Sequence, residues 1–194
     1  IAACSEEYSA TPIALLAREG LLSDRFTAVH GIHVTAAEIS ELTKARAFIC
    51  ACPTTERNLG DGIVPALDYL QAGVRVALGS DSQAQIDLLE DARELEYHLR
   101  LQKLQRGMLS AEQLFRSATQ VGAASLQVPT DAQDYFTVDL NDPSIAGTES
   151  DHLLAAIVFG LNRTAVRDVI VGGAFIVRDG RHPLQEEIVQ SFLK

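Results

Sequence analysis

Two side chains with clear chemical use each follow a short apolar segment of the chain. His30 comes directly after the apolar run 26–29, and Asp81 follows the run 74–78 within the segment Gly79-Ser80-Asp81-Ser82. Neutral imidazole and carboxylate both ligate zinc, and a zinc-bound water reaches a pKa of about 7. The two residues therefore suit a metal ion and its water, with general-base catalysis as the alternative role for Asp81.

These residues also have purely structural interpretations. A histidine at a strand end is often a polar cap, and a Gly-Ser-Asp-Ser segment is often only the entry to a helix, because Ser and Asp cap helix N-termini. Among the other histidines, we expect His33 to face solvent in a loop and His98 to lie on the surface of a helix. No role is predicted for His152 or His182.

The elements that must position His30 and Asp81 alternate between strands and helices. Apolar runs at 26–29, 47–51 and 74–78 have the composition of buried strands. Strands separated by helices predict βαβ units and a parallel sheet, whose ligands bind at the carboxyl ends of the strands. We therefore expect His30 and Asp81 to share a pocket, with their nearest polar atoms roughly 4–7 Å apart. Helices are predicted at 35–46, 64–71, 87–104 and 110–126, the first and last opened by the capping boxes Thr35/Glu38 and Ser110/Gln113.

The last third of the chain has a different pattern. Residues 135–140 have the composition of a strand, and the runs 169–171 and 174–177 flank Gly172-Gly173, which is typical of a two-residue hairpin. We therefore predict two domains, 1–130 with the βα units and 131–194 with a small antiparallel unit. Periodicity alone leaves open whether the parallel sheet is doubly wound or part of an eight-stranded barrel.

Composition narrows the class of partner. The chain has 194 residues, 47% of them hydrophobic, and a net charge of -10. The negative charge argues against nucleic acid or an anionic membrane as a partner. Its longest apolar run, Leu153 to Leu161, is far shorter than the roughly 20 residues that span a bilayer. Three cysteines give no disulfide framework, so we expect a reducing, cytoplasmic location and interpret Cys50 and Cys52 as small buried strand residues.

Three segments together resemble the deaminase branch of the amidohydrolase superfamily. Residues 28–33 (AVHGIH) resemble its sixth strand, 52–63 (CPTTERNLGDGI) the loop after its seventh, and 78–82 (LGSDS) its eighth. With the helix 87–100 and the segment 171–182, the chain most resembles the formimidoylglutamate deiminases of histidine degradation. The resemblance implies the C-terminal portion of a metal-dependent (β/α)8 TIM-like barrel plus the C-terminal part of a small β-sandwich.

The resemblance also implies roles for the two residues. Asp81 would be a ligand of zinc or another divalent metal and would accept a proton from the attacking water, while His30 would polarise or orient the group under attack. The family's remaining ligands, a His-x-His pair, a further His and a nearby Glu, would lie upstream of Ile1. Because the chain begins with Ile1 and its only methionine is Met108, we expect a fragment that lacks the N-terminal half of the barrel. On its own it should bind metal weakly and be inactive, since a stable zinc site takes three or four ligands.

The implied reaction is deimination of N-formimino-L-glutamate to N-formylglutamate and ammonia. Two carboxylates on this substrate call for cationic or hydroxyl donors, and the candidates are Arg57, Ser80 and Ser82, with Thr54 and Thr55 beside them. Pairing of Arg57 with Glu56 or Asp61 at the surface is the alternative interpretation. For the whole chain, the alternatives are an aminohydrolase of purine, pterin or triazine rings, and a non-catalytic remnant or structural subunit. The resemblance is also compatible with a homodimer.

Overall fold

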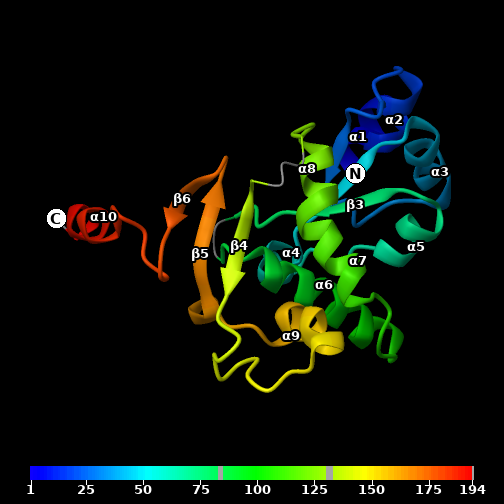
Figure 1. The fold of residues 1–194 in the computed structure, drawn as a ribbon. Helices are drawn as coiled ribbons and strands as arrows, with labels where there is room; N and C mark the ends of the chain where they lie inside the picture. Colours follow the sequence, from blue (N-terminus) through cyan, green and yellow to red (C-terminus); the bar gives the residue numbers. More distant parts are fainter. Residues whose placement is uncertain (83–84, 130–132, 194) are drawn as a thin grey trace. The chain divides into compact units, whose positions relative to one another are not determined.

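The computed structural model describes residues 1–82, 85–129 and 133–193. Contacts between residues divide the chain into two units, Ile1–Val128 and Pro129–Lys194 (Figure 1). The predicted domain boundary between residues 130 and 131 lies outside the described residues.

The first unit is built on a three-stranded parallel sheet. Its strands are β1 (Thr27–Val29), β2 (Phe48–Ala51) and β3 (Arg75–Leu78), and they lie side by side in that order. This confirms the predicted βαβ arrangement. Since the three strands run in the same direction, their carboxyl ends meet at one edge of the sheet, where the residues that follow them are brought together.

Helices precede the sheet and connect its strands. The predicted capping boxes at Thr35/Glu38 and Ser110/Gln113 are both present, and Asp87 caps the long helix that follows β3. The helix that begins at Ser110 contains one π-helical turn before it ends near Leu126. The helices of this unit are α1 (Ala2–Tyr8), α2 (Pro12–Arg18), α3 (Ala36–Ala45), α4 (Pro53–Leu59), α5 (Ala66–Gln71), α6 (Leu88–Lys103), α7 (Ala111–Arg116), the π-helix η1 (Ser117–Val121) and α8 (Gly122–Ser125).

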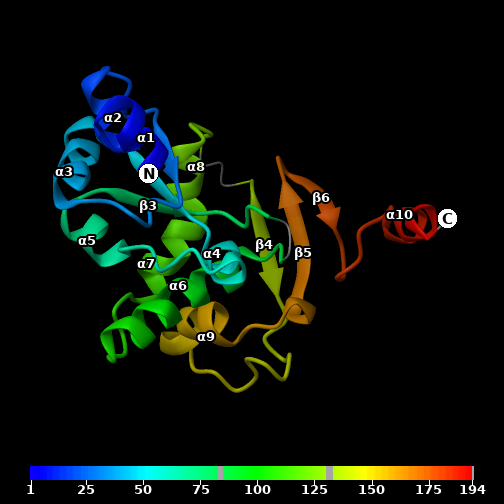
Figure 2. The ribbon, with the colours of Figure 1, turned by 180° about the vertical axis from the view of Figure 1, so that it is seen from behind.

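One element was not expected. The segment after β2 resembles a family loop, but its first half forms the helix α4. Pro53 stands at the first helical position, where its missing N–H costs nothing, and Gly60 ends the helix in the left-handed conformation. Helix α4 packs against α6, and both views of the chain show the two helices side by side (Figures 1 and 2).

The second unit contains a three-stranded antiparallel sheet. Its strands are β4 (Tyr135–Val138), β5 (Val166–Val171) and β6 (Ala174–Val177), in that order. Gly172 and Gly173, with φ of 56° and 77°, form the two-residue turn between β5 and β6, which confirms the predicted hairpin. The other elements are the 3₁₀ turns η2 (Ser150–His152) and η3 (Arg163–Ala165) and the helices α9 (Leu153–Gly160) and α10 (Gln185–Phe192).

Within the part of the chain that the structure describes, each helix is too short or too polar to cross a membrane.

Candidate functional site

His30 is held firmly at the end of β1. Its backbone N–H donates to the carbonyl oxygen of Cys50 at 2.8 Å, which continues the ladder between β1 and β2 by one residue. Its φ of 65° is left-handed, a conformation that is uncommon for a residue with a Cβ atom and that often occurs at functional sites. Gly31 follows with φ of 63°, and its carbonyl accepts a 2.6 Å hydrogen bond from the buried hydroxyl of Tyr69. The backbone thus turns sharply at the point where the imidazole is presented.

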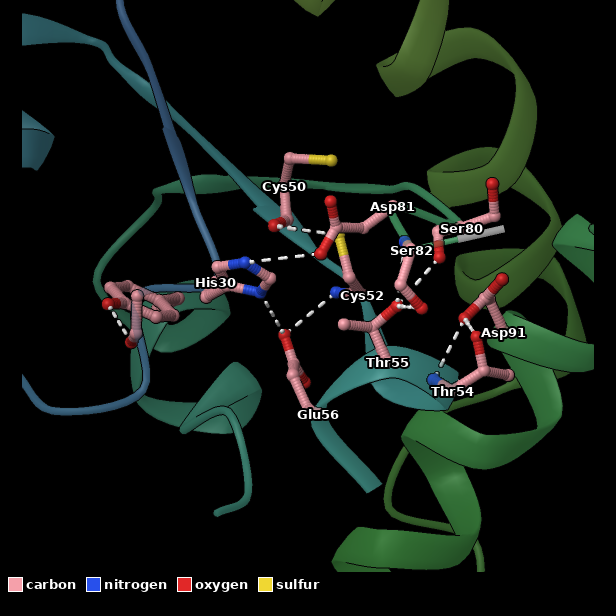
Figure 3. A network of polar contacts seen from close by, with 12 residues as sticks. His30, Cys50, Cys52, Thr54, Thr55, Glu56, Ser80, Asp81, Ser82 and Asp91 are labelled. Atoms are coloured by element: carbon pink, nitrogen blue, oxygen red, sulfur yellow. Dashed lines mark hydrogen bonds and ion pairs between the residues drawn. The ribbon is translucent and has the colours of Figure 1, made fainter. Parts of the chain in front are cut away.

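Asp81 is placed in a similar way after β3. The N–H of Gly79 donates to the carbonyl of Ala51 at 2.9 Å, and Asp81 itself has a φ of 53°. Nε2 of His30 lies 3.6 Å from Oδ2 of Asp81 (Figure 3). The structure therefore brings the two predicted residues together at the carboxyl edge of the sheet. The expected separation of roughly 4–7 Å is wrong, because the imidazole and the carboxylate contact each other directly.

A third residue, Glu56, joins this pair and was not predicted. Its Oε1 lies 3.3 Å from Nδ1 of His30 and accepts a 2.8 Å hydrogen bond from the backbone N–H of Cys52. The side chain of Glu56 is only 1% exposed, and its Oε2 has no hydrogen-bond partner among the described residues. His30 thus lies between two carboxylates, with one ring nitrogen toward each (Figure 3).

Three consecutive residues at the start of α4 organise the surroundings of the pair. Thr54 donates its N–H and its hydroxyl to Oδ1 of Asp91 on α6, at 3.0 and 2.8 Å. Thr55 donates its hydroxyl to the carbonyl of Ser80 at 2.8 Å and accepts from the N–H of Ser82 at 3.1 Å. Successive helical residues point about 100° apart, so Thr54 faces α6, Thr55 faces the Asp81 loop and Glu56 faces His30.

Of the predicted substrate-binding residues, Ser80 and Ser82 flank Asp81, whereas Arg57 is directed toward α6. Ser82 lies next to Asp81, and its hydroxyl is 3.0 Å from that of Thr55; the carbonyl of Ser80 is held by the same threonine. Arg57 forms a 2.6 Å ion pair with Glu94 on α6, rather than with Glu56 or Asp61 as the alternative interpretation had it.

Two expectations about histidines have opposite outcomes. His33 is exposed, as predicted. The prediction of a surface position for His98 is wrong, because this side chain lies on the inward face of α6 and is 9% exposed. Its Nε2 lies 3.0 Å from Oε2 of Glu94, which therefore bridges His98 and Arg57.

Burial dominates the electrostatics around His30. Desolvation raises the pKa of Glu56, and the N–H of Cys52 and the imidazole of His30 partly oppose that rise. The hydrogen bond with Cys50, together with burial, raises the pKa of the Cys52 thiol, so this thiol stays protonated at neutral pH. A neutral thiol is a poor nucleophile and a poor metal ligand, so Cys52 is not a candidate for either role.

The described residues fit part of a metal site. Within residues 1–82, 85–129 and 133–193, no group of three or more His, Cys, Asp or Glu side chains is arranged to hold a metal ion. Asp81 offers a carboxylate and His30 an imidazole, both of which suit zinc, whereas a catalytic zinc site takes three protein ligands. The donor set therefore fits a site completed by ligands from elsewhere.

A cavity of about 340 Å³ opens beside His30. Its lining includes His33 and Asp61 together with the apolar side chains of Val29 and Ile32. Among the described residues, Asp81 does not line this cavity, so the pair shares a direct contact rather than this pocket.

Comparisons with known proteins give a consistent result. The model of the Amidohydrolase family matches residues 2–176. The chain is 34% identical to formimidoylglutamate deiminase of Pseudomonas aeruginosa, over 98% of the chain and 45% of that relative. It is 30% identical to 5-methylthioadenosine/S-adenosylhomocysteine deaminase of Pyrococcus abyssi, over 97% of the chain and 47% of that relative. A zinc-bound adenosine deaminase structure from Xanthomonas campestris superimposes with a TM-score of 0.90 at 25% identity, over 100% of this chain and 47% of that one. The chain thus spans about half the length of the proteins that it matches.

Proposed function

Because this chain belongs to the amidohydrolase family, we propose that it supplies part of the active site of a metal-dependent deiminase that hydrolyses a C–N bond. The observation that carries this proposal is the contact between His30 and Asp81 at 3.6 Å, at the carboxyl edge of a parallel sheet. Both residues have left-handed backbones just after strands, which supports the proposal because ligands of parallel sheets bind at the carboxyl ends of the strands.

In the proposed architecture, this chain forms one part of a barrel and a further segment forms the rest. Residues 1–130 would form the last three βα units of a (β/α)8 barrel, and residues 131–194 would form the C-terminal part of a small β-sandwich. The relatives extend over roughly twice the matched length, and we propose that the corresponding half supplies the remaining metal ligands.

The residues of this chain suit a hydrolytic reaction. A divalent metal bound by Asp81 would supply an activated water, and the zinc-bound Xanthomonas structure favours zinc. The Asp81 carboxylate would also accept the proton of the attacking water and return it to the leaving nitrogen. The imidazole of His30, at hydrogen-bonding reach of the same space, would orient the group under attack.

The proposed substrate is N-formimino-L-glutamate. The 34% identity to a formimidoylglutamate deiminase over nearly the whole chain supports it, as does the low aromatic content of 6%, since a planar ring would favour stacking partners. Ser80 and Ser82 are the proposed polar contacts beside Asp81. The substrate contact of Arg57 stays a prediction, because its guanidinium is paired with Glu94. The adenosine-type ring is the second candidate substrate, because the Pyrococcus relative is almost as similar.

The test is kinetic, on the full-length zinc-loaded protein that carries this chain. We expect N-formimino-L-glutamate to be turned over with a kcat/KM of roughly 10⁴ M⁻¹s⁻¹ or more, and 5-methylthioadenosine far more slowly. The variant Asp81→Asn should lower kcat/KM by about 10³-fold or more, while Glu112→Gln, a change in an exposed carboxylate, should leave it unaltered. A preference for the ring substrate would overturn the substrate assignment. Absence of turnover for both would favour the non-catalytic alternative.

A further inference from the structure

We propose that Glu56 is the positioning residue for His30, holding the ring with Nδ1–H toward Glu56 and Nε2 toward Asp81 and the reacting atoms. The inference rests on the proposed function, because it gives His30 a defined protonation pattern for the deimination step. It goes beyond that function by assigning a role to a buried carboxylate on a different element, the helix α4.

The first argument is geometric. Oε1 of Glu56 is fixed by the N–H of Cys52 at 2.8 Å, and from that position it lies 3.3 Å from Nδ1 of His30. The histidine backbone is fixed independently by its bond to Cys50. The acceptor oxygen and the backbone that carries the ring are therefore both held, so the contact sets how the ring is rotated about its side-chain bonds.

The second argument concerns the proton on the ring. A neutral imidazole has one N–H and one lone pair, and Oε1 of Glu56 already accepts from the backbone N–H of Cys52, so it faces His30 as an acceptor. Oε1 of Glu56 lies 3.3 Å from Nδ1, whereas Oδ2 of Asp81 lies 3.6 Å from Nε2. The shorter contact therefore favours the form with the proton on Nδ1, which leaves the lone pair of Nε2 for the reacting atoms. The hydrogen bond made by one ring nitrogen decides what the other can do, which is the usual way in which proteins set the tautomer of a functional histidine.

The third argument is energetic. Oε2 of Glu56 has no partner among the described residues, although the side chain is almost completely buried. Burying a carboxyl oxygen without a hydrogen-bond partner makes the folded state less stable. An apolar side chain of similar size would avoid that cost, so the carboxyl group at this position is explained by its contact with His30.

The fourth argument is that the rest of α4 keeps Glu56 in place. Thr54 fastens the start of the helix to Asp91, and Thr55 fastens it to the Asp81 loop. One short helix thereby sets the relative positions of His30 and Asp81, which lie on separate segments (Figure 3). Precision of this kind is needed in a catalytic group, because small displacements cause large losses of rate.

Two variants of the full-length, zinc-loaded protein test the inference. Glu56→Gln keeps the shape and one acceptor oxygen but removes the charge, so we expect kcat to fall about tenfold. Glu56→Ala frees Nδ1, so we expect kcat to fall about 100-fold, in the range typical of lost orienting partners. In both variants KM should change by less than about threefold and zinc content should stay the same. Glu112→Gln is the control and should change neither parameter.

A measurement that does not depend on turnover separates this inference from the proposed function. Ring ¹⁵N spectra of His30, assigned by comparison with His30→Gln, report which nitrogen carries the proton at about pH 8.5, where an ordinary imidazole is neutral. We expect the proton on Nδ1 in the unmodified protein and its redistribution toward Nε2 in Glu56→Ala. An unchanged tautomer in a folded Glu56→Ala protein would overturn the inference even if the substrate assignment holds. If the substrate assignment fails instead, the spectra still decide the role of Glu56.

Discussion

Two buried glutamates in the first unit have nearly the same exposure but very different surroundings. Glu96 on α6 is completely buried, and both of its oxygens are used: Oε1 accepts from Nε of Arg100 at 2.8 Å and from the N–H of Gly107 at 2.9 Å, and Oε2 accepts from the N–H of Leu109 at 2.8 Å. Glu56 on α4 uses one oxygen for two contacts, while the other oxygen has no partner among the described residues.

The difference separates a structural carboxylate from one with a proposed function. Glu96 links the segment after α6 to the helix and forms an ion pair with Arg100. Its negative charge is therefore balanced by an arginine and by backbone N–H groups. Glu56 instead contacts the backbone N–H of Cys52 and a histidine that faces the proposed reaction site. Folded proteins pair nearly all buried polar atoms, and the exceptions concentrate where function requires them. The comparison therefore predicts that changes at Glu96 affect stability and changes at Glu56 affect rate.

The largest expected effect on stability is that of Glu96→Ala. The substitution leaves backbone N–H groups at residues 107–109 without their acceptor and removes one partner of Arg100. Breaking a buried pair of this kind costs about 3–5 kcal/mol in free energy of unfolding. Urea unfolding of the full-length protein measures it, with Glu112→Ala as an exposed control expected to cost less than about 0.5 kcal/mol. If Glu96→Ala unfolds like the control, the proposed structural role of Glu96 is wrong.

An intermediate effect is expected at Asp91, which resembles Glu56 in one respect. Its Oδ1 accepts twice from Thr54, and its Oδ2 is buried without a partner among residues that the structure describes. We expect Asp91→Ala to cost about 1–3 kcal/mol, because two donors of Thr54 lose their acceptor. Asp91→Asn keeps an acceptor oxygen and removes the buried charge, so it should cost less.

The same site predicts a dependence on pH. Burial raises the pKa of Asp91, so the folded state holds this proton more tightly than the unfolded state. The contribution of Asp91 to stability is therefore largest below the ordinary carboxyl pKa of about 4 and is lost as the pH rises through the raised value. When the free energy of unfolding is plotted against pH across that range, the curve should be flatter for Asp91→Asn than for the unmodified protein. Parallel curves would contradict the assignment.

The sequence predicted the sheet well because local patterns determine it. Apolar runs and the capping boxes at Thr35 and Ser110 predict the parallel sheet correctly. The rule that parallel strands end at one edge predicts the meeting of His30 with Asp81. The hairpin at Gly172-Gly173 followed from two residues that both tolerate a positive φ.

The sequence did not reveal what depends on contacts between distant segments. The sequence pattern predicts a loop after β2 and therefore gives no role to Glu56. In the structure Glu56 lies in α4, and its partner His30 is 26 residues away along the chain. A carboxylate just beyond a strand end was the available signal, since the same reasoning had selected Asp81. The sequence predicts a surface position for His98 and a substrate contact for Arg57, with a local ion pair as the alternative. It does not reveal their contacts with Glu94, because these depend on how α4 packs against α6. Periodicity gives the face of a helix only approximately and does not give its neighbour.

The smallest expected effect is that of Arg57→Ala, which sharpens the comparison by testing the other charged residue next to Glu56. The Arg57 side chain is 46% exposed and pairs with Glu94 at 2.6 Å, while Glu94 also contacts His98. Because an ion pair this exposed is screened by water and Glu94 keeps a second partner, the substitution should cost no more than about 1 kcal/mol in free energy of unfolding. The helix directs Arg57 toward α6 and Glu56 toward His30, so we expect KM for N-formimino-L-glutamate to change by less than about threefold and kcat to stay constant. Arg57→Lys, which keeps the charge, is the matched control. A rise in KM of about tenfold or more in Arg57→Ala, with kcat unchanged, would instead support the substrate-binding role predicted from the sequence, because losing one charged contact to a carboxylate has that magnitude.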